Sequence, residues 1–261
     1  MIRIAAVGDV HLDGEARGRL RPALEHVGDH ADALLLAGDL TRHGTVEEAA
    51  AVRDEFSDLP VPVIAVLGNH DYHGDAAEEV TALLTEGGII VLEGDGVVVE
   101  TSGGTLGVAG VKGFGGGFGR GTLEPWGEAG VKQFVHAAVE EGLKLERALA
   151  RLHCPQRVAL LHYAPIRETV LGEPEEIFAF LGCGRLEEPL NRYGVSAIFH
   201  GHAHRGAHTG KTAAGIPVYN VALPVMRQLD ANALPIKIIE LPVAPCAPPE
   251  PAAAVPELAR A

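Results

Sequence analysis

The chain has 261 residues, of which 47% are hydrophobic, so it can bury one sizeable core. Its formal net charge of −14 at neutral pH argues against a broad basic surface for nucleic acid. Three scattered cysteines, apolar runs too short for a bilayer and no signal-peptide pattern together favour a cytoplasmic protein with reduced thiols and no membrane segment; the cysteines are Cys154, Cys183 and Cys246.

Short apolar runs predict ten strands, and longer periodic segments predict five helices. The strands are expected at residues 2–7, 33–37, 61–67, 89–92, 97–101, 106–111, 157–162, 195–200, 217–221 and 236–241. The helices are expected at residues 17–27, 45–56, 76–86, 131–152 and 187–193, the second opened by a capping box. Early strands alternate with helices and middle strands follow one another, which indicates an α/β fold with mixed sheets.

Five polar motifs follow five of these strands, each directly after an apolar run. In chain order they are Asp9-Val10-His11, Gly38-Asp39, Gly68-Asn69-His70-Asp71, His162 and Gly201-His202-Ala203-His204. Taken singly, an Asp or Asn after a strand often caps a helix or holds a turn, and a lone His is often a core residue. Five such motifs in order are hard to explain that way, so we expect them to converge on a metal site at one end of a sheet.

The motifs offer seven candidate ligands, which is more than one ion needs. They are Asp9, His11, Asp39, Asn69, His162, His202 and His204. Oxygen and imidazole ligands without cysteine suit two divalent ions such as Mn, Fe or Zn. Asp39 is the natural bridge between two ions, because a carboxylate has two oxygens whereas a neutral imidazole offers one lone pair.

These motifs resemble those of the calcineurin-like metallophosphoesterase superfamily, from about Asp9 to about Leu223. The resemblance implies two sheets packed face to face with helices outside, a four-layer αββα sandwich. It implies one metal ion on Asp9, His11, Asp39 and His204, and the other on Asp39, Asn69, His162 and His202. It leaves His70 free of metal and over the scissile phosphate, where it stabilises charge or protonates the leaving oxygen.

One position separates this chain from the protein Ser/Thr phosphatase branch of the superfamily. In that branch an Asp that partners the catalytic histidine follows the Gly-Asp motif, whereas Arg42 stands at that position here. The chain therefore resembles a small bacterial-type member. The partner that orients His70 stays open, and Asp71 is adjacent in sequence only.

The predicted chemistry is hydrolysis of a soluble phosphoester, with a phosphodiester favoured over a monoester. A hydroxide bridging the two ions would attack the phosphorus, and His70 would assist the leaving group. A nuclease of the same superfamily is one alternative, for which a basic track is available in Arg167, Arg185, Arg192, Arg205 and Lys211. A noncatalytic metal-binding or scaffold protein is the other.

Two segments complete the prediction. Residues 1–241 are expected to form the catalytic domain, and the Pro- and Ala-rich residues 242–261 a flexible tail. The glycine-rich residues 110–121 match no nucleotide-binding pattern and are expected to form a mobile loop. From that loop and just beyond it, four side chains are candidates for substrate contact: Phe114, Phe118, Arg120 and Trp126.

Overall fold

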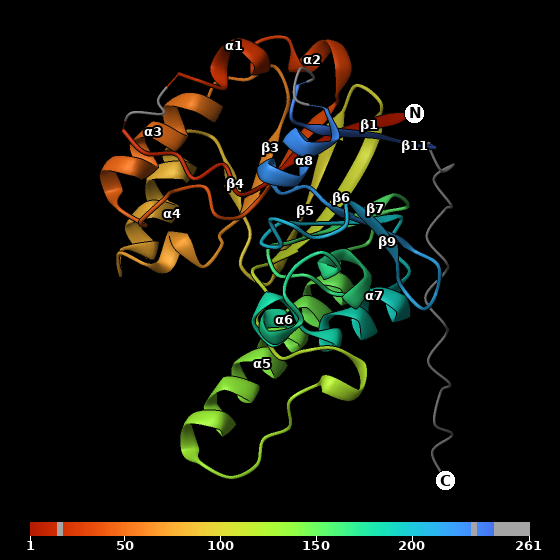
Figure 1. Ribbon diagram of the computed structural model, residues 1–261. Helices are drawn as coiled ribbons and strands as arrows, with labels where there is room; N and C mark the ends of the chain where they lie inside the picture. Colours follow the sequence, from red (N-terminus) through yellow and green to blue (C-terminus); the bar gives the residue numbers. More distant parts are fainter. Residues whose placement is uncertain (15–17, 231–233, 243–261) are drawn as a thin grey trace, which may run out of the picture.

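The computed structural model describes residues 1–14, 18–230 and 234–242, and its strands form two sheets (Figure 1). The first sheet has the order β11 (Lys237–Leu241), β1 (Ile2–Val7), β2 (Ala33–Ala37), β3 (Val63–Val66) and β4 (Ile90–Val91). The second has the order β5 (Asp95–Thr101), β6 (Gly104–Val111), β7 (Arg157–Leu161), β8 (Ala197–His200), β10 (Pro217–Asn220) and β9 (Thr209–Lys211).

Both sheets are mixed, as the sequence predicts. Strands β1 to β4 run parallel to one another, and so do β6, β7, β8 and β10. The antiparallel strands β11, β5 and β9 lie at the edges. All ten predicted strands are present, with ends shifted by at most two residues. The three-residue strand β9 was not predicted, because Thr209, Gly210 and Lys211 carry no apolar signal.

Eight helices and five short 3₁₀ turns occur in the described ranges. The helices are α1 (Arg21–Leu24), α2 (Val27–His30), α3 (Val46–Phe56), α4 (Ala77–Glu86), α5 (Ala129–Arg151), α6 (Phe178–Leu181), α7 (Glu187–Tyr193) and α8 (Leu223–Leu229). The 3₁₀ turns are His70–Tyr72, Gly119–Gly121, Arg167–Val170, Glu175–Ile177 and Gly184–Leu186. The predicted capping box is present at Thr45 and Glu48, where α3 begins.

The prediction of one helix over residues 17–27 is wrong: the segment holds the short helix α1 and only the first residue of α2, and residue 17 lies outside the described ranges. The cause is a distant side chain. The carboxylate of Glu55, which is buried in α3, accepts hydrogen bonds from the backbone N–H groups of Gly18, Leu20 and Arg21. Because it satisfies free N–H groups at this point, α1 begins only at Arg21.

The core divides into three apolar layers that match a four-layer sandwich. One lies between the first sheet and helices α3 and α4, and includes Leu34, Phe56 and Leu84. The second lies between the two sheets, and the third between the second sheet and helices α5 and α7. In Figure 1, α3 and α4 cover one side of the strands while α5 and α7 cover the other. The predicted αββα arrangement is confirmed.

Three further predictions concern membrane helices, the cysteines and the C-terminal tail. Within the described residues, no helix combines the length and apolarity that crossing a membrane needs. Cys154 and Cys183 are buried and form no disulfide. Cys246 and the predicted flexible tail, apart from Pro242, lie outside the described residues.

Candidate metal centre

The five motifs lie at the carboxyl ends of five parallel strands drawn from both sheets. Asp9, Asp39 and Asn69 follow β1, β2 and β3 of the first sheet. His162 follows β7, and His202 follows β8 of the second sheet. Because parallel strands in a sheet end at the same edge, and because the two sheets pack face to face, the motifs meet at one edge of the sandwich. The predicted convergence is therefore present in the fold.

Four of the candidate ligands have a backbone conformation that side chains with a Cβ rarely adopt. The φ angles are +54° at Asp9, +42° at His11, +49° at Asp39 and +68° at His202. Such left-handed residues are uncommon outside glycine, and they gather at functional sites where the surrounding structure holds them. Backbone bonds do so here: Asp9 N–H donates to Gly38 O at 2.9 Å, and His11 N–H to Asp39 O at 3.0 Å.

Two motif glycines are required by close approach. A Cβ placed on Gly68 would lie 2.1 Å from Asp39 Oδ1, and one placed on Gly201 would lie 2.2 Å from Asp9 Oδ2. Both distances are far below van der Waals contact. The glycines therefore leave the room that the two carboxylates occupy between adjoining strand ends.

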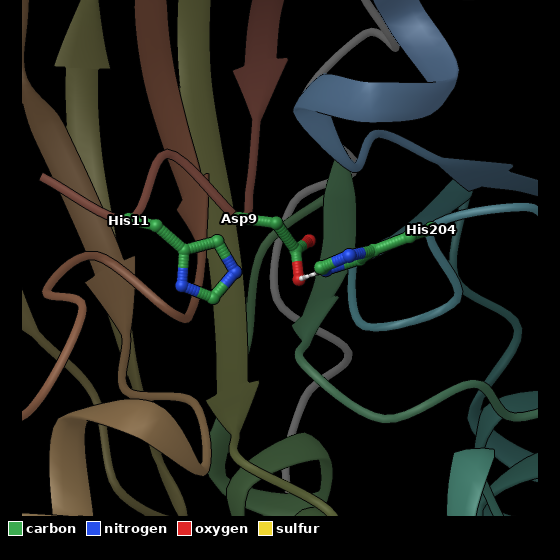
Figure 2. Close-up of side chains that lie close together, drawn as sticks. All are labelled: Asp9, His11 and His204. Atoms are coloured by element: carbon green, nitrogen blue, oxygen red, sulfur yellow. Dashed lines mark hydrogen bonds and ion pairs between the residues drawn. The ribbon is translucent and has the colours of Figure 1, made fainter.

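Asp9, His11 and His204 form the first group of candidate ligands, with one donor atom from each within 4.8 Å of the others. In Figure 2 the Asp9 carboxylate stands between the two imidazole rings. His204 Nε2 lies 3.0 Å from Asp9 Oδ1, and the backbone N–H of His202 donates to both oxygens of Asp9 at 3.0 and 2.9 Å. These contacts fix the orientation of the carboxylate.

A second group is formed by Asp39, His162 and His202, again with donor atoms within 4.8 Å. His162 Nε2 lies 3.3 Å from Asp39 Oδ1 and 3.0 Å from Asn69 Oδ1, so the amide belongs to the same cluster. The other oxygen of Asp39, Oδ2, lies 3.7 Å from His11 Nε2. Asp39 therefore has one oxygen toward each group, as a bridging ligand requires.

Backbone carbonyl groups determine which ring nitrogen each histidine presents. His162 Nδ1 lies 2.9 Å from the carbonyl oxygen of Ala37, and His202 Nε2 lies 3.1 Å from that of Phe180. A carbonyl oxygen can only accept, so these nitrogens carry the protons. The remaining nitrogen on each ring is then free to bind a cation, an arrangement typical of histidine ligands.

The protonation of the cluster also suits cation binding. Burial lowers the pKa of His11 to about 4 and that of His202 to about 3, and it lowers the pKa of His162 well below its usual range. These rings are therefore neutral at pH 7, the form that ligates metals. Burial raises the pKa of Asp9, and a nearby divalent cation would favour its ionised form.

A buried ring nitrogen without a hydrogen-bond partner tests whether these residues fit a metal ion. His11 Nε2 is buried, and among the described residues it has no hydrogen-bond partner. An unsatisfied buried nitrogen is costly, and a cation bound to its lone pair would offset that cost. Together with an oxygen and imidazole donor set, this atom shows that the residues fit divalent cations of the Mn, Fe and Zn type.

His70 lies beside the cluster and has a partner that the sequence left open. Its ring Nδ1 lies 2.7 Å from the backbone carbonyl oxygen of Arg42, and the backbone N–H of His70 donates to Asp39 Oδ1 at 2.8 Å. The ring centroids of His70 and His11 are 4.5 Å apart. His70 also forms a third group of possible metal ligands with His11 and Asp39, with one donor atom from each within 4.8 Å of the others. Its Nε2 is not used by the contact with Arg42.

Asp71, which follows His70 in the sequence, holds two loops together. Its carboxylate is fully buried and accepts hydrogen bonds from the N–H groups of Leu40, Thr41 and Gly68, and from the Thr41 hydroxyl at 2.6 Å. It thus joins the loop after β2 to the loop after β3. Sequence reasoning considered Asp71 only as a partner of His70, because its polar neighbours in the sequence carry no signal that its side chain is buried.

The glycine-rich residues 110–121, which the sequence predicts to be a mobile loop, include the end of β6 and contact the segment around Ala179. Gly116 N–H donates to Ala179 O at 2.7 Å, and Gly117 N–H to Gly182 O at 2.9 Å. Glycine gives this packing its room, because a Cβ on Gly115 would lie 2.6 Å from Ala179 O. Phe118 is buried in a small apolar cluster, so it is not available to a substrate.

The other three proposed substrate contacts lie in different surroundings. Phe114 packs against Phe134 and Tyr163, with ring centroids 4.9 and 5.9 Å apart. Arg120 and Trp126 are exposed. Of the four side chains, Phe114 comes nearest to the metal cluster, since the Tyr163 ring also contacts His202 at a centroid distance of 4.3 Å.

Known proteins show a similar fold. The chain aligns over 94% of its length with 98% of a phosphopantetheinyl hydrolase from Mycobacterium tuberculosis, at 16% identity and a TM-score of 0.66. It aligns over 85% of its length with 72% of GAP50 of Plasmodium (10%, TM-score 0.51), and over 84% with 48% of a putative 5'-nucleotidase from Staphylococcus aureus (16%, TM-score 0.50). No curated protein sequence matches the chain.

The sequence itself matches the family model described as calcineurin-like phosphoesterase over residues 2–206, a range that includes all five motifs. That range covers most of the chain, and the sandwich of two mixed sheets agrees with it. The chain therefore belongs to the calcineurin-like phosphoesterase family and is a metal-dependent hydrolase of phosphoric esters.

Proposed function

We propose that this protein is a dinuclear-metal phosphodiesterase that hydrolyses a small soluble phosphoester, and that residues 1–241 form its catalytic domain. The observation that carries the proposal is the position of Asp39. One of its oxygens faces His162 and the other faces His11, so its carboxylate joins two groups of ligands. We assign one ion to the first group with Asp39, and the other to Asp39, Asn69, His162 and His202.

Divalent cations bound there would supply the acidity that turns water into a nucleophile near neutral pH and would offset the charge of the phosphate. The chain's own residues orient the reaction. The oxygen of water forms a bond to phosphorus while the bond to the leaving oxygen breaks. We assign to His70, with protons on both ring nitrogens, the transfer of the Nε2 proton to the leaving oxygen, because its Nδ1 proton is held by Arg42 O and the residue lies beside Asp39 and His11. The proton that the attacking water loses passes to solvent.

The ion pair formed by Arg42 supports a diester over a monoester. The phosphate of a diester carries one negative charge, so it needs fewer cationic partners than that of a monoester. Arg42, the basic residue within the motifs, has an exposed side chain that pairs with Asp13 at 3.1 Å. Only its carbonyl group reaches His70.

A nuclease is less well supported. Three residues of the basic track are paired with acids: Arg167 with Glu175 at 3.0 Å, Arg185 with Glu124 at 3.2 Å, and Arg192 with Glu188 at 2.7 Å. These pairs reduce the positive charge that the track would offer to a phosphate backbone.

A noncatalytic scaffold is also less well supported. One similar structure, GAP50, is described as an anchor, whereas the others include a phosphopantetheinyl hydrolase and a putative 5'-nucleotidase. A scaffold would not need His70. In this chain the His70 ring is held by Arg42 O with one nitrogen left free, which is the arrangement of a group that acts on a substrate.

Hydrolysis of two chromogenic esters tests the proposal. Metal-stripped protein would be reloaded separately with Mn, Zn, Fe(II) or Mg and assayed with bis-p-nitrophenyl phosphate and p-nitrophenyl phosphate, with Asp39→Ala as the control. Preference for the diester supports a phosphodiesterase, and preference for the monoester overturns it in favour of a phosphatase. Salt-sensitive binding to oligonucleotides would favour the nuclease. Protein that binds metal but shows no Asp39-dependent turnover of either ester would favour the scaffold.

A further inference from the structure

A sixth parallel strand ends at the same edge as the five metal motifs. Strand β6 pairs in parallel with β7, and Val111 stands opposite Leu161 in the register. The next residue on each strand is therefore Lys112 beside His162. The two are joined directly, because the N–H groups of His162 and Tyr163 both donate to Lys112 O at 3.0 Å. Lys112 thus stands at the position that a further ligand motif would take.

The side chain of Lys112 stays near the metal cluster. Its Nζ lies 5.3 Å from the ring centroid of Tyr163, the residue after His162, and 5.4 Å from that of Tyr72, two residues after His70. The third ring is Phe114, at 5.0 Å. Nζ donates to Gly113 O at 3.0 Å, and the side chain is partly exposed. The aromatic rings stabilise the cation and restrict where it can lie.

Lys112 and the nearby Lys144 differ in the ion pairs that they form. Lys144 pairs with Glu141 at 2.8 Å and with Glu93 at 3.5 Å. Among the described residues no carboxylate forms an ion pair with Lys112, although the protein is strongly acidic. The carboxylates of Glu141, Glu93 and Asp39 act on the charge of Lys112 from beyond ion-pair distance. No direct ion pair with a described residue neutralises the ammonium group, so an anion bound beside it would gain from its charge.

We propose that Lys112 binds a second phosphate group of the substrate, next to the phosphate held at the metal cluster. This inference rests on the proposed function and narrows its substrate class to esters or anhydrides that carry two neighbouring phosphate groups. Tyr72 and Tyr163 border the same space.

Binding of inorganic phosphate and pyrophosphate to the metal-loaded protein tests this role through affinity, with phosphate release monitored to check that pyrophosphate is not hydrolysed during the titration. Isothermal titration calorimetry would give both Kd values, with the free metal concentration fixed and the bound metal measured in each sample. Phosphate can occupy the metal cluster alone, whereas pyrophosphate can reach both positions. Lys112→Met should raise the Kd for pyrophosphate roughly tenfold to hundredfold and leave that for phosphate unchanged.

Two further variants separate charge from structure. Lys112→Arg keeps the charge and should restore most of the affinity for pyrophosphate. Lys144→Met removes the neighbouring, paired lysine and should change neither Kd. The proposal is overturned if Lys112→Met weakens both anions equally or neither. If that variant does not fold, Lys112→Gln replaces it, and wild-type protein that binds pyrophosphate no more tightly than phosphate also overturns the proposal.

The two proposals fail in different ways. Wild-type protein that binds pyrophosphate through Lys112 but does not hydrolyse either chromogenic ester would contradict the proposed function and leave the second phosphate position standing. Protein that hydrolyses the diester but binds pyrophosphate independently of Lys112 would contradict the second phosphate position and leave the proposed function standing.

Discussion

The Nδ1 atom of His70 lies 2.7 Å from the backbone carbonyl oxygen of Arg42. A backbone group therefore takes the place of the acidic partner that the protein Ser/Thr phosphatase branch supplies. Because a carbonyl oxygen only accepts, Nδ1 carries a proton, and Nε2 is the nitrogen left to act on a substrate. The orientation of His70 thus depends on the path of the loop after β2, which Asp71 holds to the loop after β3.

The first prediction concerns His70. His70→Ala should lower kcat by about 10²–10⁴-fold, because it removes the group that protonates the leaving oxygen. The variant should still bind metal, since none of the proposed ligand assignments uses His70. Steady-state kinetics with bis-p-nitrophenyl phosphate and metal analysis of the same samples would check both parts. Loss of metal in this variant would show that His70 is a ligand.

Arg42 provides the matched comparison. Arg42→Ala removes the exposed side chain but keeps the carbonyl group that holds His70, so activity should stay close to that of the wild type. A loss as large as that of His70→Ala would mean that the guanidinium group itself acts on the substrate.

The second prediction concerns the shared carboxylate. Asp39→Ala should abolish activity and reduce the bound metal by at least one ion per chain, because the two oxygens of Asp39 face different ligand groups. Inductively coupled plasma analysis after dialysis would count the ions. Full activity with two ions bound would exclude Asp39 as the bridge.

The third prediction tests the room that glycine leaves for the carboxylates. Gly68→Ala would place a methyl group 2.1 Å from Asp39 Oδ1 if nothing moved, so the carboxylate must shift. Metal affinity should fall by roughly 10–100-fold, as for other disturbances of ligand orientation. Metal titration would measure the change.

A glycine in an open position is the control for that variant. Gly130 lies in α5, and a Cβ there meets no atom within 4 Å. Gly130→Ala should therefore keep metal affinity and raise the free energy of unfolding by about 0.4–1 kcal/mol. Equal metal affinity in Gly68→Ala and wild type would show that the two loops adjust without cost to the site.

Much of this site could be predicted from the sequence, because its information is local. Each ligand directly follows an apolar run, and parallel strands bring their carboxyl ends together. The residues that orient the ligands could not be predicted in this way. Phe180 O holds His202 and Ala37 O holds His162, and these contacts join loops far apart in the chain. Any residue type supplies a carbonyl group, so the sequence carries no sign of it.

Two features of the fold that the sequence did not predict have the same origin. The helical pattern of residues 17–27 gives no sign of Glu55, whose carboxylate comes from another helix and binds the N–H groups before α1. The glycine-rich residues 110–121 lack side chains that predict packing, yet the small size of Gly115 and Gly116 lets the backbone reach the segment around Ala179. In both places a distant contact decides the local structure.

The fourth prediction concerns the ion pair of Arg3 and Asp32 in the first sheet; the Asp32 carboxylate also binds a turn of the second sheet. Asp32, at the start of β2, accepts hydrogen bonds from the backbone and side chain of Arg3 and from the Ser102 hydroxyl in the turn between β5 and β6. The hydrogen bond from Arg3 lowers the pKa of Asp32 from 3.8 to about 2. Asp32→Asn should lower the free energy of unfolding at pH 7 by roughly 1 kcal/mol, after allowance for solvent screening at the partly exposed Arg3.

The contribution of Asp32 to the free energy of unfolding should decrease as the pH falls. Because the pKa of Asp32 is lower in the folded protein than its ordinary value of 3.8, its stabilisation is complete above about pH 4 and is lost as the pH falls toward 2. The difference between wild type and Asp32→Asn should therefore shrink over that interval in urea unfolding. Asp29→Asn, at a more exposed neighbouring carboxylate, is the control and should change little at either pH. A difference that stays constant from pH 7 to pH 2 would show that Asp32 acts through packing and not through its charge.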